Sequence, residues 1–333
     1  MQDSRSMLVD EFGKRLAGRE VLVTGATGFV GSHLVERLVA LGARVTAVGP
    51  SLGWRPVVPD LVQQRSVRFV RLGAFWDPVA VKRVRREFGD TQYVVHLGYA
   101  VPGGKNALEK AVGDLRRNVL GTLGFIQQLP GSVSKICFSS SAMVYGSSPS
   151  RPVAEADCAR PATAYAVGKL ATETYLRLYA KESGVSVSIL RYATVYGPME
   201  TVPRAIPNFI RQVLAGGSPI IYGGGNDVRD YVHVLDVIEA TLLALVQDDG
   251  IQIYNVGTGR GHTTHEIAER IIRLAGKRVK PVHKAAEDGS MELVCDIARA
   301  QRRLGYKPKV KLDEGLSDEI RYFADNPKLW REL

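Results

Sequence analysis

The chain has 333 residues, of which 45% are hydrophobic and 23% charged, and its formal net charge is +10. This length suits one large domain with an appended lobe, and no apolar run approaches the ~20 residues of a membrane-spanning helix. The three cysteines show no metal-ligand or redox spacing and the polar start lacks a signal-peptide core, so we expect a reduced, cytoplasmic protein without a membrane partner.

The basic charge raises the question of nucleic-acid binding, but it is spread along the chain. The sharpest cluster, residues 82–86, falls on a predicted surface helix, as is typical of a solvated face. The six histidines are not paired at ligand spacing. The sequence therefore predicts no nucleic-acid partner and no metal site.

Strands and helices alternate from about residue 21 to residue 192, which predicts an α/β fold with a doubly wound parallel sheet. Strands are expected near residues 21–24, 44–48, 67–72, 93–97, 133–139 and 185–191. Beyond Pro198 the rhythm breaks and prolines and glycines mark loops. The C-terminal part is therefore expected to form a smaller lobe.

The first strand runs into a glycine-rich turn, G-x-x-G-x-x-G, that opens a helix. Gly25 permits a tight turn, Gly28 lets the backbone approach a pyrophosphate, and Gly31 lets the helix lie close to the sheet. Unpaired N–H groups at the helix N-terminus favour phosphate. The predicted cofactor contacts in this turn are Gly25, Thr27, Gly28, Phe29, Val30 and Gly31.

The second strand does not end on the acidic residue that would bind the ribose 2′-hydroxyl of NAD. Instead it is followed by Ser51 and Arg55, either of which could receive the 2′-phosphate of NADP. An ordinary surface arginine is the equal alternative for Arg55. The sequence pattern thus leaves NAD and NADP open.

Tyr165 and Lys169 stand four residues apart on a predicted helix and share one face, and the serine triplet 139–141 lies upstream. A nearby ammonium favours the phenolate, and lowering a tyrosine pKa by three units takes about 4 kcal/mol. This constellation suits removal of a proton from an alcohol, or its return to a ketone. The same spacing also arises by chance as a packed tyrosine and a solvated lysine.

These motifs, in this order, resemble the extended short-chain dehydrogenase/reductases, specifically the NAD-dependent epimerase/dehydratase group that acts on sugar nucleotides. The resemblance covers about residues 19–320, and the matching stretches are residues 24–31, 94–97, 118–122, 138–141, 144–146, 165–169, 190–192, 195–198, 229–234 and 254–259. It implies an N-terminal extension (1–18), a Rossmann-type NAD(P)-binding domain (19–197) to which a strand near 251–256 returns, and a mainly substrate-binding α/β lobe (198–333).

The resemblance also implies roles for single residues. Ser141 resembles the donor to a substrate oxygen, Tyr165 the acid/base, and Lys169 the residue that tunes Tyr165 and binds the nicotinamide ribose. Asn118 resembles a support of the active site and Arg229 a contact to the nucleotide diphosphate. The resemblance further assigns Leu97, Asn118, Tyr165 and Lys169 to the cofactor, and Ser141, Thr194, Asn208, Tyr222 and Arg229 to the nucleotide-sugar substrate. It implies a homodimer that pairs the helices carrying Asn118 and Tyr165.

The residues after Ser141 bear on the reaction. Dehydrating members of the group need an Asp-Glu pair there and decarboxylating members usually keep a Glu, whereas this chain has Ala142 and Met143. We therefore predict a 4-epimerase of a nucleotide hexose that works through a 4-keto intermediate. An NADP-dependent 4-ketoreductase is the alternative, and a non-catalytic dinucleotide sensor is a third. The chain also departs from the group at Gly98 and Tyr99, where two alanines are common.

Overall fold

The computed structural model describes residues 12–53, 55, 57–73, 77–100, 106–148, 151–200, 202–285 and 291–328. The chain forms two compact units that alternate along the sequence. The first unit comprises Met1–Val144, Ala159–Arg191 and Ile238–Tyr254. The second comprises Tyr145–Cys158, Tyr192–Val237 and Asn255–Leu333.

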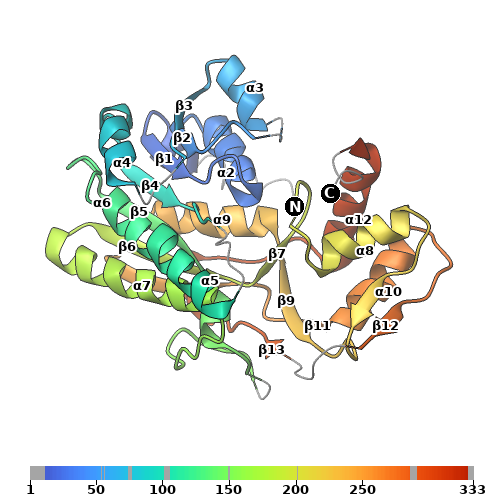
Figure 1. Ribbon diagram of the computed structural model, residues 1–333. Coiled ribbons are helices and arrows are strands. Elements are labelled where there is room, and N and C mark those ends of the chain that lie inside the picture. The colour runs from blue at the N-terminus through green and yellow to red at the C-terminus, as the bar shows by residue number, and fades with distance from the viewer. Residues whose placement is uncertain are drawn as a thin grey trace. The chain divides into compact units, whose positions relative to one another are not determined.

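A seven-stranded parallel sheet lies at the centre of the Rossmann-type fold, in the order β10-β6-β5-β4-β1-β2-β3 (Figure 1). Its strands are β1 (Glu20–Thr24), β2 (Arg44–Gly49), β3 (Val67–Arg71), β4 (Tyr93–His96), β5 (Lys135–Ser141), β6 (Ser186–Tyr192) and β10 (Ile251–Val256). The fold class predicted from the sequence is confirmed, and β10 joins the edge of the sheet beside β6.

Helices follow the strands and cover the sheet. They are α2 (Phe29–Ala40), α3 (Val57–Gln63), α4 (Pro78–Val84), α5 (Ala107–Asp114), α6 (Gly121–Ile126), α7 (Ala164–Ser183) and α9 (Val234–Leu245). Right-handed crossovers put α2 and α3 on one face and the α4–α7 group on the other (Figure 1). Leu22, Val94, Ile136 and Ile189 from neighbouring strands are buried in the core that these helices close.

The strand order reverses between β1 and β4, since the chain leaves β1 for β2 on one side and reaches β4 on the other. Ligands of open α/β sheets bind outside the carboxyl ends of the strands at such a switch point. Here Gly25 follows β1 and Leu97 follows β4. The fold therefore brings the predicted cofactor turn and the loop after β4 to one place.

The described part of the expected N-terminal extension packs on the first unit. Residues 12–16 are helical, and the side chains of Phe12 and Leu16 are buried. The Gly18 N–H donates to the Gly42 carbonyl at 2.8 Å. Residues 1–11 lie outside the described part of the chain.

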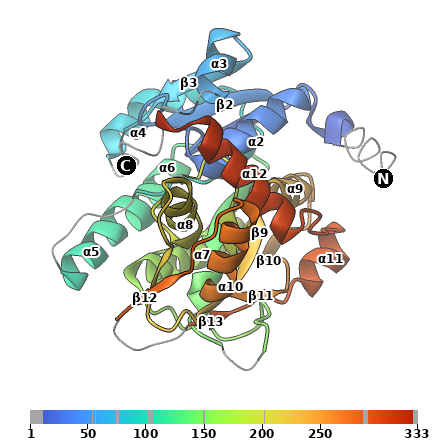
Figure 2. The same ribbon diagram turned by 90° about the vertical axis from the view of Figure 1, so that its right-hand side faces the viewer.

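The second unit is built around a small mixed sheet, in which β9 pairs with β7, β11 and β13. Helices α8, α10 and α12 pack together beside it, and their apolar faces close a core around Phe209, Ile210 and Ile271 (Figure 2). The elements are β7 (Thr194–Tyr196), α8 (Ala205–Leu214), β8 (Ile220–Tyr222), β9 (Val228–His233), β11 (Gly261–Thr263), α10 (Thr264–Leu274), β12 (Val282–Lys284), β13 (Glu292–Leu293), α11 (Ala298–Leu304) and α12 (Leu312–Asp325).

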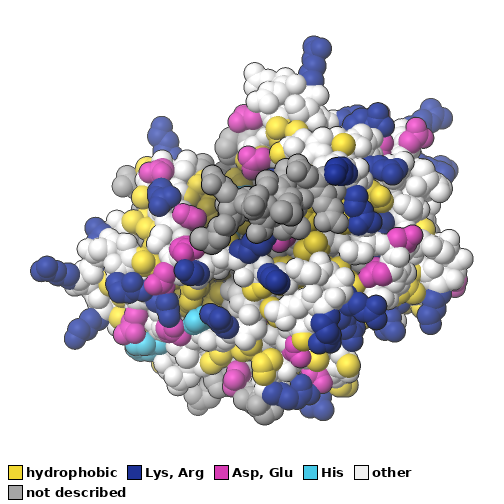
Figure 3. Space-filling view, turned by 180° about the vertical axis from the view of Figure 1, so that it is seen from behind, with side chains coloured by type: hydrophobic (Ala, Val, Ile, Leu, Met, Phe, Trp, Pro, Cys, Tyr) yellow, Lys and Arg dark blue, Asp and Glu magenta, His cyan; other side chains and the backbone are white. Residues whose placement is uncertain are grey.

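Basic and acidic side chains are interspersed over the face seen in Figure 3. Within the described residues, every helix is too short or too polar to cross a bilayer.

Candidate active site

The glycine turn after β1 is as tight as its sequence pattern predicts. Gly25 has φ +65°, and a Cβ there would come within 2.9 Å of the Gly98 N atom. A Cβ on Gly28 would lie 3.0 Å from the Gly25 carbonyl oxygen, and one on Gly31 only 2.1 Å from it. A side chain is therefore excluded at Gly25 and Gly31 and would be crowded at Gly28, which leaves the bare backbone of the turn open to a phosphate.

The start of α2 suits an anion. Gly28 is the N-cap and supplies no side-chain acceptor to the first helical N–H groups, which Phe29 and Val30 carry. The positive end of the helix dipole adds to these donors. The predicted residues Thr27 to Gly31 therefore fit the pyrophosphate of a dinucleotide.

Ser51 and Arg55 are both used within the loop after β2. Arg55 Nη1 donates to the Thr27 carbonyl at 3.2 Å, and Ser51 Oγ accepts from the Gly53 N–H at 3.3 Å. The Arg55 side chain thus lies against the glycine turn. Both side chains therefore make hydrogen bonds to the backbone, Ser51 within the loop after β2 and Arg55 to the glycine turn.

Replacing Gly31 with alanine should disturb the turn, because the new methyl group would clash with a backbone oxygen. We expect the melting temperature to fall, with a loss of about 1–3 kcal/mol of stability, and NAD affinity to fall with it. Gly124→Ala in α6 is the matched control, since nothing lies within 4 Å of its Cβ position. Calorimetric titration with NAD and thermal melts measure both effects; unchanged NAD affinity in Gly31→Ala would contradict this account of the turn.

Asn118 holds the loop after β4. Its side chain accepts from the Ala100 N–H at 2.8 Å and donates to the Ala100 carbonyl at 2.9 Å. Asn118 lies in a π-helical segment, Leu115–Leu120, where the helix widens between α5 and α6. Such segments often occur at functional sites. Asn118, which the sequence predicts to support the active site, thus makes two backbone hydrogen bonds to the loop that also carries Leu97.

His96 at the end of β4 is a core residue. Its Nδ1 lies 2.7 Å from Thr24 Oγ1 and its Nε2 lies 2.9 Å from Thr122 Oγ1. The ring stacks between Phe125 and Phe138, with centroids 5.5 and 5.9 Å away. Burial, and secondarily the charge of Lys169, lowers the pKa of His96 to about 3, so the folded protein holds it neutral.

The neutral state of His96 predicts acid sensitivity. Below pH 6.5 the unfolded chain binds a proton at this imidazole, whereas the folded protein does not until about pH 3. Stability is therefore fully present above pH 6.5 and falls by about 1.4 kcal/mol per pH unit below it. Urea unfolding at pH 7 and pH 5 should show the advantage of wild type over His96→Gln shrinking as the pH falls. An advantage independent of pH would refute this.

Tyr165 and Lys169 lie in the first two turns of α7, which begins where the Thr163 side chain caps the Ala166 N–H at 3.2 Å. Lys169 Nζ donates to the Ser139 carbonyl at 2.6 Å and lies 5.9 Å from the centroid of the Tyr165 ring. The predicted pair is thus brought together beside β5.

Lys169 is nearly fully buried. Burial lowers the pKa of its amine to about 8, although the charges of Asp114 and Glu173 raise it. The Phe138 ring lies 4.8 Å from Nζ. A lysine with this pKa is still largely a cation at neutral pH, which is the state that favours a neighbouring phenolate.

Ser141 is the last residue of β5 and is 9% exposed. Its Oγ accepts from the Met143 N–H at 3.2 Å, so its hydrogen remains to be donated. Ala142 is buried in the turn that follows, and neither Ala142 nor Met143 carries a group that can transfer a proton.

Two residues near this pair were not among the predicted site residues. The Tyr99 ring meets the Tyr165 ring edge-on, with centroids 4.9 Å apart, and its hydroxyl donates to the buried carboxylate of Asp114. Burial, then the bond to Asp114, raises the pKa of Tyr99. The departure from two alanines at residues 98–99 was a signal for Tyr99. For Asp114 the sequence held no signal other than its position one helical turn before Asn118.

The remaining predicted substrate residues belong to the second unit. Thr194 lies on β7 opposite Tyr231, Asn208 on α8 accepts a hydrogen bond from Arg211, and Tyr222 ends β8 and is 69% exposed. Arg229 lies on β9 opposite His262.

Asp230, the residue after Arg229, has a structural role in the sequence motif 229–234. Asp230 is 1% exposed and accepts hydrogen bonds from the backbone of Thr258, Gly259 and Cys295. A Cβ on Gly257 would lie 2.4 Å from its carboxylate. Asp230 therefore fixes a loop, and because neighbours on a strand point to opposite faces, Arg229 points away from that task.

The amino-acid sequence of this chain is similar to that of known proteins. The model of the NAD dependent epimerase/dehydratase family matches residues 21–257. The UDP-glucose 4-epimerase of Mycolicibacterium smegmatis is 32% identical over 311 residues, which are 91% of this chain and 98% of that protein.

Solved structures agree with the family match. UDP-glucose 4-epimerase with UDP-glucose from Thermotoga maritima has a TM-score of 0.83 at 32% identity, covering 92% of this chain and 99% of that one. The NAD complex of the Thermus thermophilus UDP-glucose 4-epimerase has a TM-score of 0.81 at 34% identity with the same coverage. Other matches are named as a dehydratase and a decarboxylase, so reactions differ among relatives. The chain is therefore an enzyme of sugar-nucleotide metabolism and belongs to the NAD-dependent epimerase/dehydratase family.

Proposed function

We propose that this enzyme epimerises a nucleotide hexose at C4 through a 4-keto intermediate, with Tyr165 as the acid/base. One observation carries the choice of reaction: the two positions after Ser141 hold Ala142 and Met143, which cannot transfer a proton, so the proposed proton transfer falls to Tyr165. Elimination or decarboxylation would need a further carboxyl group at that turn. The epimerase names of the M. smegmatis, T. maritima and T. thermophilus proteins support the proposal.

The residues would divide the work as follows. The Ser141 hydrogen is donated to the sugar O4, since the Ser141 oxygen already accepts from Met143. Tyr165 takes the proton from O4 and later returns it, and the buried Lys169 cation favours its phenolate form. NAD held by the glycine turn at Thr27 to Gly31 would supply the hydride acceptor for C4 and the donor for its return. Return of the hydride to the opposite face of the keto-sugar inverts C4.

The second unit would hold the nucleotide. We propose Arg229 as the contact to the diphosphate, because a guanidinium presents paired donors to phosphate oxygens. The half-exposed or exposed positions of Thr194, Asn208 and Tyr222 leave them open to the sugar and base.

We propose NAD as the cofactor. In the loop after β2, Arg55 donates to the Thr27 carbonyl of the glycine turn and Ser51 accepts from the Gly53 N–H, so both residues belong to the structure of the loop. A bound NAD in the T. thermophilus structure agrees with this preference. One observation favours the alternative of an NADP-dependent 4-ketoreductase: β2 ends at Gly49 and Pro50 follows, without a carboxylate for the ribose of NAD.

The test is whether the purified enzyme retains NAD and interconverts C4 epimers of UDP-hexoses with no cofactor added. Nucleotide release on denaturation identifies the retained cofactor, and chromatography of the sugar nucleotides follows turnover. Cofactor-free protein that oxidises NADPH stoichiometrically with a 4-keto sugar would make it a reductase. A bound dinucleotide without any turnover would instead support the third hypothesis, a non-catalytic dinucleotide sensor.

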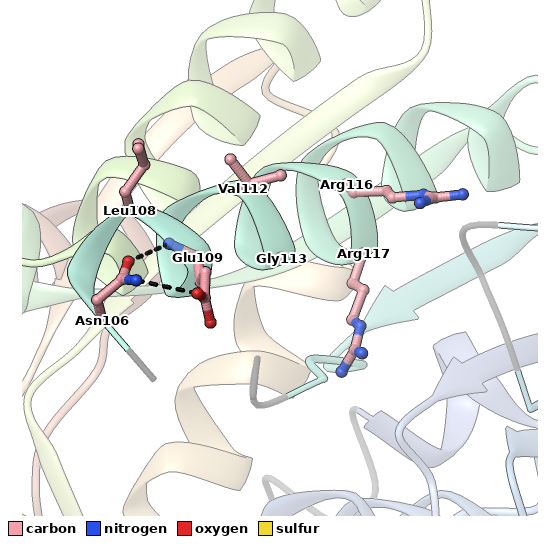
Figure 4. A pocket seen from close by; sticks show the side chains of 7 residues that line it. All are labelled: Asn106, Leu108, Glu109, Val112, Gly113, Arg116 and Arg117. Atoms are coloured by element: carbon pink, nitrogen blue, oxygen red, sulfur yellow. Dashed lines mark hydrogen bonds between the residues drawn. The ribbon is translucent and has the colours of Figure 1, made fainter. Parts of the chain in front are cut away.

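We propose that the chain forms the homodimer expected from the resemblance, and exposed apolar side chains on two packed helices support this. Leu108, Val112 and Leu115 follow each other at helical spacing and are 74%, 58% and 53% exposed. On α7, Val167 and Leu178 are about equally exposed. Figure 4 shows the Leu108 and Val112 side chains standing out from the helix. Both also line a pocket, together with Asn106, Glu109, Gly113, Arg116 and Arg117. We propose that a second copy of this chain covers this stripe.

Val112→Asp should break the dimer, because it places a carboxylate in the middle of the apolar stripe. Light scattering after size exclusion should show dimers for wild type and monomers for the variant. Val79→Asp on α4 is the control, since Val79 is also an exposed helix valine, at 67%. A dimer that survives Val112→Asp would place the interface elsewhere.

A further inference from the structure

Asp114 is a carboxylate that the proposed mechanism does not use, although only 1% of it is exposed. A carboxylate at that depth needs donors and a nearby positive charge. Its donors are the Tyr99 hydroxyl and Asn118 Nδ2, the latter at 2.8 Å. The positive charge is supplied by Lys169, whose pKa Asp114 raises against the effect of burial.

The Asp114 carboxylate lies in a notch of α7 at Gly168. A Cβ on Gly168 would lie 1.8 Å from Asp114 Oδ2, so any other residue there would push α5 and α7 apart. Gly168 lies between Tyr165 and Lys169 in the sequence. The negative charge is therefore held against the α7 backbone within the segment that carries the proposed acid/base.

Tyr99 connects this charge to the Tyr165 ring. Its hydroxyl is bound to Asp114, and its ring meets that of Tyr165 at 82° with centroids 4.9 Å apart. Lys169 Nζ lies 5.1 Å from the Tyr99 centroid. One tyrosine thus contacts all three groups.

We infer that Asp114 and Tyr99 are positioning residues of this centre: Asp114 supplies the negative charge that faces Lys169, and Tyr99 fixes both Asp114 and the ring of Tyr165. The inference rests on the proposed function, which gives Tyr165 and Lys169 their roles. The titratable and charged groups that face Lys169 are Asp114 from α5, His96 and Tyr99 from the end of β4, Tyr165 and Glu173 from α7, and, through Glu173, Arg191 from β6.

Asp114→Asn keeps the shape and removes the charge. Without the negative charge, the protonated forms of Lys169 and Tyr165 are less favoured, so both limbs of the pH–rate profile of the holoenzyme should move to lower pH, by about one unit. Carbon-13 NMR titration of labelled lysine, with Lys169 assigned from Lys169→Arg, should show the same shift without any turnover. Wild-type titration of Lys169 in Asp114→Asn would overturn the inference.

Tyr99→Phe keeps the ring and the Asp114 charge but removes the bond between them. We expect kcat to fall about tenfold with KM little changed, because the geometry of the centre loosens. The limbs of its profile should not move to lower pH, which separates it from Asp114→Asn. If Asp114→Asn does not fold, this variant carries the test, and an unchanged kcat would overturn the inference.

Asp249→Asn is the matched control. Asp249 pairs with Lys135 at 3.2 Å at the start of β5, about 20 Å along the strand from Ser141. The Asp249→Asn variant should be less stable than wild type, but both limbs of its pH–rate profile should stay in place. The Lys169 titration also distinguishes failure of the proposed function from failure of the inference about Asp114. A fully active Tyr165→Phe would refute the acid/base role, while a shifted Lys169 titration in Asp114→Asn would still establish the charge pairing.

Discussion

Tyr165→Phe should lower kcat about a thousandfold, because positioned acid/base groups contribute about 10²–10⁴ to rate and phenylalanine cannot exchange a proton. Tyr165 lies in the first turn of α7 with the Lys169 amine 5.9 Å from its ring centroid, and the ring of the variant can keep its contact with Tyr99. The enzyme should therefore fold, bind NAD and bind nucleotide sugar while failing to turn over. Steady-state kinetics with calorimetric titration of both ligands measures this.

Tyr175→Phe is the control, since Tyr175 lies on the same helix and its side chain is 48% exposed. Its activity should equal that of wild type. Comparable kcat values for Tyr165→Phe and Tyr175→Phe would show that another group moves the proton. A loss confined to KM would make Tyr165 a binding residue.

Glu173→Gln should destabilise the first unit by about 3–5 kcal/mol, the usual cost of leaving one partner of a buried ion pair alone. Glu173 and Arg191 are 2% and 5% exposed, and two guanidinium nitrogens lie 2.6 and 3.0 Å from the carboxylate. Ser140 donates to the same carboxylate. The variant would leave the Arg191 charge buried against a neutral amide. Urea and thermal unfolding report the loss.

Two comparisons test the cause. Asp157→Asn breaks a similar two-pronged pair with Arg151, but at the surface, and should unfold close to wild type. The double variant Glu173→Leu, Arg191→Met should recover much of the loss, because neither charge is then stranded. If Glu173→Gln proves as stable as wild type, the pair is not needed for the packing of α7 on β6.

The sequence predicted those features that depend on short spacings. The strands of the main sheet were each placed within two residues of their bounds, because buried parallel strands are short apolar runs. The glycine turn followed from backbone sterics within seven residues, and Tyr165 and Lys169 from the turn of one helix. Each of these signals is local, so no knowledge of distant contacts was required.

Features that join distant segments were not predicted. Asp114 acquires its place only because Gly168 lets α5 approach α7, and Asp230 only because the loop at Gly257 folds back on it. The strands that pair with β9 have two or three residues each and come from β7, β11 and β13. Strands this short carry no periodicity that could be recognised before the fold exists.

The alternation of the two units has a consequence for how such an enzyme can change. The chain passes from one unit to the other five times, after residues 144, 158, 191, 237 and 254. Neither unit can therefore be inherited as one continuous gene segment, and a single recombination event cannot exchange one whole unit without part of the other. The second unit is therefore more easily altered by point substitutions than by exchange of the whole unit.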